Sequence, residues 1–414
     1  MQHRLRKATV MAALVTLMAS GACSSGFKSN NNTPQQSTGP VSLQVMIASS
    51  GDAETNAVKA AAAAWASTTG NTATVTPAQD INQQLGQAFA GGTPPDVFYV
   101  DASRVADYAK VGALDPYASK DPDVNDFYQS LRDAFTINGQ LYCIPKDFST
   151  LALEINTDLW AKAKLTEADY PTTWDQLMTV SKKLKAAGIT PLATADTRDR
   201  LGAFVVEAGG WWTNKDGTQA TADSSAAVTA LTFVQSMLKS GLAVYPKQVD
   251  AGWGGEAFGK GKTAMAMEGN WIKGAMQTDY PNIKYVVKQL PAGPAGPGTL
   301  SFTQCWGIAA KSAHKDAALN FVEAMTSKDQ QIAFAKAFGV MPSRQSAKAD
   351  YLAQFPNDAA FIDSADFAQG PLKAPKVDSV LSDFDSQLGG LASGSPQAIL
   401  QRFQQNLSSA LTAG

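Results

Sequence analysis

The sequence predicts an α/β protein with a mainly parallel sheet and helices on its faces, divided between two domains. From Val41 onward, runs of strand-forming residues alternate with segments in which apolar residues recur at helical spacing. This alternation is typical of βαβ units, whose strands are parallel. The chain has 414 residues, which is too long for one ordinary hydrophobic core and fits two domains.

Residues 1–22 have the layout of a secretory signal. Arg4 and Arg6 precede the short apolar run ATVMAALVTLM, and small residues follow up to Cys23. The apolar run is too short to span a bilayer. A cysteine directly after small residues resembles the lipobox of bacterial lipoproteins, in which Cys23 is lipidated, although Ser20 stands where leucine is usual. The alternative is a plain secreted protein that is cleaved nearby.

Residues 23–40 are predicted to be the lipidated cysteine and a flexible tether. They are rich in Ser, Asn, Gln and Pro, so they cannot bury enough apolar surface to fold. No later segment of the sequence is long and apolar enough to cross a membrane. We therefore expect an exported body that an N-terminal lipid anchors to the outer face of the cytoplasmic membrane.

The predicted elements alternate at first and are mainly helical later. The first part contains strand 41–48, helix 52–67, strand 72–78, helix 80–92 and strand 94–101. Asp52 or Thr55 is the expected cap of the first helix. The later helices are predicted at 174–188, 224–241 and 395–411. Thr172 or Thr173 and Ser395 are the expected N-caps there.

Charge and motif content exclude several classes of protein. Charged residues make up 17% of the chain and the formal net charge is −2, with no cationic tract to follow a phosphate backbone, so nucleic acid is not an expected partner. Beyond the signal the only histidine is His314, which argues against zinc sites and a Ser–His–Asp triad. The segment GKGKT (259–263) lacks the glycine spacing of a phosphate-binding loop. We expect no metal and no cofactor.

An exported carbohydrate-active hydrolase stays open on the residues alone. Such an enzyme needs only two carboxylates, and the candidates are Asp101, Asp147, Glu207 and Glu268. Their spacing does not decide between an enzyme and a binding protein.

The placement of the tryptophans is the most unusual feature of the sequence. Three lie in helix-like segments and are expected in a core: Trp65, Trp160 and Trp174. Five stand beside glycines at segment ends: Trp211, Trp212, Trp253, Trp271 and Trp306. Each of these five either packs into a core or is displayed. Displayed rings near Asp, Asn and Gln suit a sugar, whose apolar face stacks on an aromatic ring.

Several longer stretches follow one another in a specific order. They are PPDVFYVDASRVADYAKVGALDPY (94–117), NGQLYCIPKDFSTLALEINTDLW (138–160), EAGGWWTNKDG (207–217), AFGKGKTAMAMEGNWI (257–272) and LPAGPAGPGTLSFTQCWGIAAKSAHKDAALNFVEAMTS (290–327). In this order and spacing they resemble the extracellular solute-binding proteins of bacterial ABC importers, in the carbohydrate-binding group that includes maltose-binding protein. The resemblance extends from Val41 almost to the end.

The resemblance implies a periplasmic-binding-protein-like type II fold, with two α/β lobes joined by a hinge and a ligand cleft between them. It places lobe one at 41–147 plus 305–350 and lobe two at 148–304 plus 351–414. Ligand binding would favour the closed arrangement of the lobes, which the membrane permease would recognise. The protein would be a monomer without enzymatic activity.

The resemblance also implies which residues contact the ligand, at loops and segment ends that face the cleft. They are Ser49, Ser50, Asp52, Asp101, Ser103, Asp147, Phe148, Ser149, Arg198, Asp199, Trp211, Glu268, Asn270, Trp271, Trp306 and Lys373. The loop at Ser49–Asp52 can alternatively cap the following helix, and Asp378 is an alternative to Lys373.

Some of these positions have a specific expected role. Trp271 matches a stacking tryptophan of the family. Arg198 and Asp199 stand where relatives carry an aromatic contact, so a polar contact is expected instead. In the GGWW segment we expect Trp211 to face the cleft and Trp212 to pack behind it.

Cys143 and Cys305 are the two cysteines that remain after Cys23. An oxidising exterior permits them to pair, and two isolated buried thiols are the alternative. The resemblance puts both on segments that run side by side near the hinge, at places where many relatives carry glycine. We therefore expect a disulfide that joins the hinge strands.

Together these features predict a receptor that binds a mono- or oligosaccharide for an ABC permease. One alternative is the hydrolase described above. The other is a receptor for a polar non-sugar such as a glycerol phosphate ester, for which Lys146, Arg198, Arg200 and Lys373 could supply positive charge.

Overall fold

The computed structural model describes residues 39–374 and 376–413. The predicted signal at 1–22, the lipidation residue Cys23 and the tether up to residue 38 lie outside the described residues. In the described part of the chain, no helix is both long and apolar enough to cross a bilayer.

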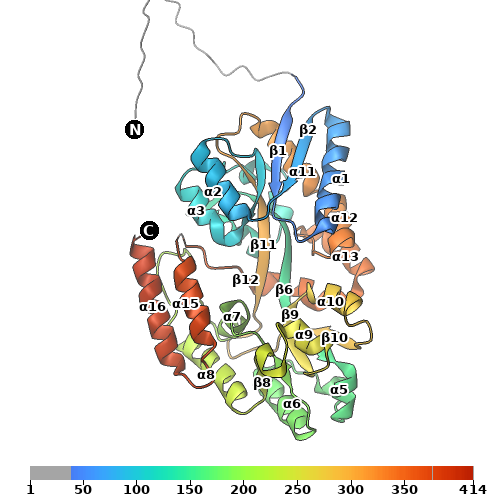
Figure 1. Ribbon diagram of the computed structural model, residues 1–414, viewed down its shortest axis with the longest axis vertical. Helices are drawn as coiled ribbons and strands as arrows, with labels where there is room; N and C mark the ends of the chain where they lie inside the picture. Colours follow the sequence, from blue (N-terminus) through green and yellow to red (C-terminus); the bar gives the residue numbers. More distant parts are fainter. Residues whose placement is uncertain (1–38, 375, 414) are drawn as a thin grey trace, which may run out of the picture. The chain divides into compact units, whose positions relative to one another are not determined.

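Ten strands of the described chain form one sheet, in the order β2-β1-β3-β11-β6-β9-β7-β8, with β10 beside β6 and β12 beside β11 (Figure 1). They are β1 (Ser42–Ile47), β2 (Thr72–Pro77), β3 (Val97–Asp101), β6 (Ile144–Asn156), β7 (Leu192–Ala193), β8 (Ala243–Val244), β9 (Met265–Gly269), β10 (Tyr285–Lys288), β11 (Thr299–Ile308) and β12 (Ala368–Gln369), and a separate hairpin contains β4 (Thr136–Ile137) and β5 (Gln140–Leu141). The predicted parallel pairing holds at the two flanks, where β1 pairs with β2 and β3 and where β7 pairs with β8 and β9. The centre is antiparallel, because β6 and β11 run in opposite directions.

The strands β6 and β11 connect the two flanks of the sheet. β11 pairs with β3 through Gln304–Ile308 and with β6 through Ser301–Trp306. Farther along, β6 pairs with β9 through Leu151–Ile155. Figure 1 shows these two long strands side by side. They contain residues 147 and 304, after which the resemblance places two of the boundaries between the lobes.

Helices flank the sheet over most of its length (Figure 1). The α-helices are α1 (Asp52–Thr69), α2 (Ile81–Gly91), α3 (Val105–Lys110), α4 (Gln129–Ala134), α5 (Thr157–Lys162), α6 (Trp174–Ala186), α7 (Arg198–Glu207), α8 (Ser225–Lys239), α9 (Gly254–Gly259), α10 (Ile272–Thr278), α11 (Lys315–Met325), α12 (Lys328–Phe338), α13 (Lys348–Gln354), α14 (Ala359–Ile362), α15 (Asp378–Leu388) and α16 (Pro396–Ala413). Thr173 caps α6 and Ser395 caps α16 through side-chain oxygens, as predicted.

The predicted cap of α1 is wrong. Gly51 occupies the N-cap position, and Asp52 already lies in the first turn. The carboxylate of Glu54 accepts instead from the backbone N–H and the hydroxyl of Ser50, both at 2.8 Å. The helix start is therefore held by a side chain inside the helix that reaches back to the loop.

Two large hydrophobic cores flank the β6–β11 pair. One contains residues from 43–144 and 305–334, and the other contains residues from 151–300 and 372–407. We term the parts around them lobe one and lobe two. The distribution of core residues favours the predicted lobe boundaries after 147, 304 and 350, which remain a prediction. The three tryptophans expected in a core are buried there: Trp65, Trp160 and Trp174.

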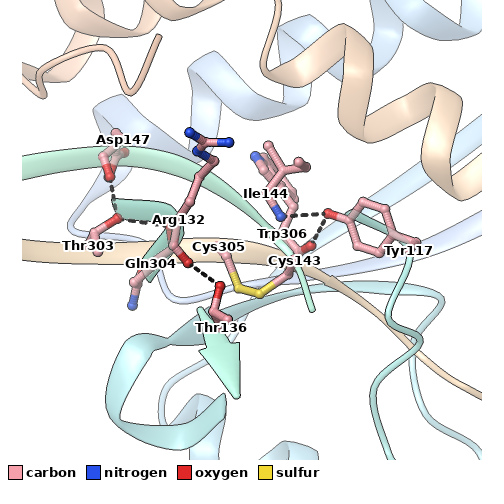
Figure 2. The surroundings of a disulfide bond; sticks show 10 residues. All are labelled: Tyr117, Arg132, Thr136, Cys143, Ile144, Asp147, Thr303, Gln304, Cys305 and Trp306. Carbon is pink, nitrogen blue, oxygen red and sulfur yellow. Dashed lines mark hydrogen bonds between the residues drawn. A yellow bond between two sulfur atoms is a disulfide. The ribbon is translucent and has the colours of Figure 1, made fainter. Parts of the chain in front are cut away.

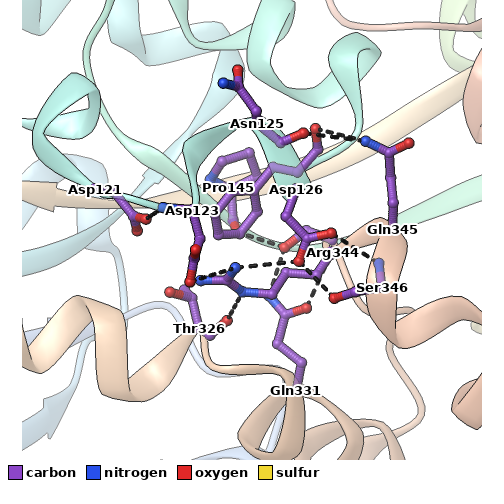
Figure 3. A network of polar contacts seen from close by, with 12 residues as sticks. Asp121, Asp123, Asn125, Asp126, Pro145, Thr326, Gln331, Arg344, Gln345 and Ser346 are labelled. Carbon is purple, nitrogen blue, oxygen red and sulfur yellow. Dashed lines mark hydrogen bonds and ion pairs between the residues drawn. The ribbon is translucent and has the colours of Figure 1, made fainter.

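Arg344 holds the segment after α12 against lobe one (Figure 3). Its guanidinium lies 3.3 Å from a carboxylate oxygen of Asp126, and its Nε donates to the carbonyl of Thr326 at 2.5 Å. The neighbouring Ser343 donates to the carbonyl of Pro145 at 2.7 Å, where β6 begins. This buried network fixes the lobe-one end of β6 to two other segments of the chain.

Cys143 and Cys305 form a disulfide, with 5.7 Å between their Cα atoms (Figure 2). Both residues are buried in the lobe-one core. Beside them the hydroxyl of Tyr117 donates to the carbonyl of Trp306 and accepts from the backbone N–H of Ile144. The pair that the sequence singles out therefore joins β11 to the residue before β6, at the lobe-one ends of both strands.

Candidate ligand-binding cleft

A cavity of about 340 Å³ lies between the two lobes, and we term it the central cavity. Its lining consists of Asn82, Asp101, Ser103 and Arg104 from lobe one, Arg198, Asp199, Trp211, Trp212, Leu300, Leu372 and Leu381 from lobe two, and Ser301, Phe302, Thr303, Gln369, Gly370 and Pro371 from the connecting segments. Five of the residues predicted to bind ligand are thus brought together: Asp101, Ser103, Arg198, Asp199 and Trp211.

A second hollow, the adjoining groove, has a volume of about 480 Å³ and shares Asp101, Phe302 and Thr303 with the central cavity. Three more predicted residues line it: Ser49, Ser50 and Asp147. The two hollows are neighbours along β11 because they share lining residues, and we term them together the cleft.

Asp101 ends β3 and presents a carboxylate to both hollows. Its Oδ1 accepts from the backbone N–H of Ser103 at 2.9 Å and from the Ser103 hydroxyl at 2.6 Å. These bonds fix the orientation of the carboxylate. A rigid carboxylate of this kind can accept hydrogen bonds from the hydroxyl groups of a ligand.

Lys146 gathers two carboxylates at one wall of the adjoining groove. Its Nζ lies 3.0 Å from Oε1 of Glu54 and 2.5 Å from Oδ2 of Asp147, and 4.5 Å from the ring centre of Tyr99. Burial raises the pKa of Asp147. Burial also opposes ionisation of Glu54, but attraction to Lys146 and the hydrogen bonds from Lys146 and Ser50 together outweigh it and lower the pKa of that carboxyl. The charge of Lys146 is therefore largely neutralised.

Arg198 begins α7 and is oriented by Asp385 of α15. The backbone N–H of Arg198 donates to Oδ1 of Asp385 at 2.7 Å, and its guanidinium pairs with Oδ2 of the same carboxylate. Asp199 follows in the first turn and is more exposed. The two residues supply the polar wall expected in place of an aromatic contact.

The two adjacent tryptophans lie in different surroundings, as predicted for the GGWW segment. Trp212 is 1% exposed and meets Phe384 and Phe403 edge-on, with ring centres 5.1 and 5.6 Å away. Trp211 is half-buried and lines the central cavity. Gly210 permits this packing, since a Cβ there would lie 3.1 Å from Val205 and from Ala226.

Trp271 stands next to the central cavity without lining it. Its ring meets Phe302, which does line it, edge-on at 5.2 Å. The exposed fraction of Trp271 is 37%, and its ring faces a larger side groove of about 1050 Å³ between α10 and α12. An exposed indole beside the cleft is available for stacking.

Two predicted ligand contacts are wrong, because their side chains are core. Phe148 is 1% exposed and packs against Tyr128, with ring centres 5.4 Å apart. Trp306 is 1% exposed and lies between Tyr99 and Phe321 in lobe one.

Other predicted contacts lie away from the central cavity and the adjoining groove. Lys373 lines a further hollow, which shares Trp211 and residues 369–371 with the central cavity, and its Nζ donates to the carbonyl of Asp133 at 2.8 Å. Asp52 is exposed on α1, and Ser149 pairs with Phe302 in the sheet.

Glu268 and Asn270 are buried beneath Trp271 and act as its support. Glu268 is 1% exposed and accepts from the Trp271 indole. Asn270 is 2% exposed and donates from Nδ2 to the carbonyl of Gly339 at 3.0 Å.

The sequence reasoning missed Phe302, which the structure puts at the centre of the cleft. Phe302 touches the Trp271 ring and lines both hollows. Strand alternation could not have singled it out, because its neighbour Thr303 also lines both hollows.

The amino-acid sequence also matches a known protein family. The sequence model of the bacterial extracellular solute-binding proteins matches residues 50–332, which is more than half of the chain. The chain belongs to this family.

Named relatives of this solute-binding protein include two sugar-binding proteins. The diacetylchitobiose-binding protein of Streptomyces coelicolor is 26% identical over 282 residues, or 65% of this chain and 65% of that one. The lactose-binding protein of Rhizobium radiobacter is 25% identical over 263 residues, or 60% of this chain and 61% of that one.

The fold of this solute-binding protein is shown by solved structures. The cyclic α-maltosyl-1,6-maltose-binding protein of Arthrobacter globiformis superimposes with a TM-score of 0.81 at 21% identity, covering 91% of this chain and all of that one. The fold is therefore the periplasmic-binding-protein-like type II fold, in which a hinge joins two α/β lobes around a cleft.

Proposed function

We propose that this solute-binding protein captures a sugar or oligosaccharide in the cleft and delivers it to the permease of an ABC importer. The observation that carries the proposal is one cavity that combines the oriented carboxylate of Asp101 with the rings of Trp211 and Phe302. Sugars bind through hydroxyl-to-carboxylate hydrogen bonds and ring stacking. The relatives named for lactose and diacetylchitobiose support this chemistry.

Calorimetry tests the proposal. The protein is titrated with lactose, diacetylchitobiose and maltose, and each mixture is then assayed for products after a day. We expect tight binding of at least one sugar with the sugar unchanged. Formation of products would favour the exported hydrolase instead, and no heat with a wider sugar panel would remove the sugar proposal.

The surroundings of Glu207 and Glu268 exclude two of the four candidate carboxylates of a hydrolase, whereas Asp101 and Asp147 line the cleft and are tested by the product assay. Glu207 is 1% exposed and accepts from the indole of Trp174 at 2.6 Å, away from the cleft. Glu268 is 1% exposed and paired with Arg200. Neither can approach a glycosidic bond as a general acid or nucleophile.

The pairing of the cleft cations argues against a phosphate ester as ligand. Lys146 is paired with Glu54 and Asp147, and Arg198 is paired with Asp385. Binding of a phosphate would require these ion pairs to separate. A titration with glycerol 3-phosphate should therefore show no binding at concentrations that saturate the sugar site.

We also propose that Cys23 carries the lipid that anchors the protein, through the tether, to the outer face of the cytoplasmic membrane. The signal-like residues 1–22 motivate this proposal. Labelled palmitate should enter the wild-type protein but not Cys23→Ala, and the variant should be released into the medium. Equal labelling of both proteins would contradict lipidation at Cys23.

A further inference from the structure

The Trp271 ring is held on several sides. A Cβ on Gly269 would overlap Cζ3 and Cη2 of the indole, so the ring lies directly against the backbone of β9. Phe302 meets the ring edge-on at 5.2 Å. The indole Nε1 donates to Oε2 of Glu268 at 3.1 Å. These contacts leave the remaining exposed part of the indole to face the solvent between the lobes.

Arg200 lies close to Phe302 and Glu268, two of the three residues that hold the ring, and to the ring itself. Its Nη2 donates at 2.6 Å to the same Oε2 of Glu268 that accepts from the indole. Its Cζ lies 5.0 Å from the ring centre of Trp271 and 5.9 Å from that of Phe302. Arg200 lines neither the central cavity nor the adjoining groove, and its side chain is 14% exposed.

We infer that Arg200 is a positioning residue, which holds the Trp271 indole in place for stacking on a ligand and does not itself contact the ligand. The inference rests on the proposed function, because it assigns a stacking role to Trp271. The guanidinium orients the indole in two ways. It lies over the indole ring, and it fixes the Glu268 carboxylate, which accepts the hydrogen bond from the indole N–H.

Loss of Arg200 should disturb this arrangement through Glu268. A buried carboxylate without a cation partner is strongly disfavoured, and Glu154 lies beside it, accepting from the backbone N–H of Glu268 at 3.2 Å. The Glu268 side chain would then turn away from its present position, and the indole would lose its acceptor. A ligand that stacks on a mobile ring must also order it, so binding weakens.

Fluorine NMR of the ligand-free protein tests the positioning directly. The protein is labelled with 5-fluorotryptophan, and the Trp271 resonance is assigned by its loss in Trp271→Phe. We expect Arg200→Gln to shift and broaden that resonance, while the matched control Arg402→Gln, a change at an exposed ion pair, leaves it unchanged. Arg200→Lys keeps the charge without the planar group and should give an intermediate shift. An unchanged Trp271 resonance in folded Arg200→Gln or Arg200→Lys would overturn the inference.

A double-mutant cycle then separates positioning from direct contact. Whichever of lactose, diacetylchitobiose and maltose binds the wild type most tightly is titrated into Arg200→Gln, Trp271→Ala and the double variant. We expect Arg200→Gln to weaken binding about tenfold when Trp271 is present and less than about twofold when it is absent. Equal losses in both backgrounds would mean that Arg200 contacts the ligand and would overturn the inference. Absence of binding to every sugar would refute the proposed function, while the NMR result would still decide the positioning.

Discussion

Trp211 and Trp212 are neighbours in the chain with ring centres 5.4 Å apart. Both line the central cavity, but Trp212 is almost fully buried and Trp211 is only half-buried. Trp212 packs against Phe384 and Phe403, whose own rings stack at 3.9 Å. Trp211 covers this cluster from the cleft side and remains half-buried. The pair therefore joins a structural anchor to a ligand-facing ring within two residues.

These different surroundings predict different effects when each of the two tryptophans is replaced by alanine. Trp212→Ala should lower the free energy of unfolding by about 3–5 kcal/mol, because it opens a large cavity in the lobe-two core. Trp211→Ala should cost much less stability and weaken sugar binding instead. Urea unfolding and calorimetry measure the two effects, and equal destabilisation by both variants would contradict this expectation.

Glu207 provides a prediction on pH. Burial raises the pKa of this carboxyl well above its ordinary 4.5, so the folded protein holds a proton that the unfolded chain releases. Its contribution to stability is therefore complete below about pH 4.5 and is lost as the pH rises toward the raised value, by about 1.4 kcal/mol per pH unit. Glu207→Gln keeps an acceptor for Trp174 and should flatten the dependence of the unfolding free energy on pH between 5 and 8. Identical slopes in both proteins would show that Glu207 ionises normally.

At the scale of single residues, sequence alone could not tell a displayed tryptophan from a buried one. Trp211, Trp271 and Trp306 all stand beside glycines, but Trp306 is enclosed by Tyr99 and Phe321 from distant segments. Only the tertiary packing of those segments decides the outcome. The family resemblance did not supply this information either, since it placed Trp306 among the ligand contacts together with Trp211 and Trp271.

At the scale of elements, the strand β6 shows what sequence patterns can predict and what they cannot. The resemblance implies a lobe boundary after residue 147, and the structure contains the strand β6 across that position. Alternation puts Asp147 and Phe148 on opposite faces, so only one of them can face the groove. Asp147 does so, while Phe148 joins the core. The sequence does not indicate which face of β6 is buried, because the residues that bury it, such as Tyr128, belong to other segments of the chain.

The disulfide beside β6 yields a prediction for this element. Its removal in Cys143→Ser/Cys305→Ser should lower the free energy of unfolding by about 2–5 kcal/mol, since the bond closes a long loop. Sugar affinity should change little, because both sulfurs lie in the lobe-one core outside the cleft. Intact mass and alkylation with and without reductant check the bond itself. Two freely alkylated thiols in the native exported protein would rule it out.

At the scale of the whole molecule, direct contacts link the two lobes around the cleft. Arg104 of lobe one pairs with Asp378 of α15 at 2.7 Å. Asn270 of lobe two donates to the carbonyl of Gly339 next to α12. Asp378, an alternative to Lys373 in the sequence prediction, thus bridges the lobes through a residue that lines the central cavity.

Because the cleft lies between the two lobes, we can predict how ligand binding changes the shape of the protein in solution. A ligand that touches both lobes favours their closed arrangement, so the radius of gyration from small-angle X-ray scattering should fall when sugar is added. Trp271→Ala should show the same fall only at higher sugar concentration. An unchanged radius of gyration at saturating sugar would mean that capture does not involve closure.

The disulfide has a mechanical consequence for that motion. It fixes the lobe-one ends of β6 and β11 to the same rigid body, so within these two strands a rotation of lobe two would be absorbed in the stretches Lys146–Thr150 and Ser301–Gln304. The pairing register of the two strands already shifts between Gln304 and Cys305, and a ladder that is interrupted there twists with the least loss of hydrogen bonds. The rotation axis of the protein should accordingly pass beside Phe302, so that the aromatic ring nearest to the ligand moves least while the walls around it close.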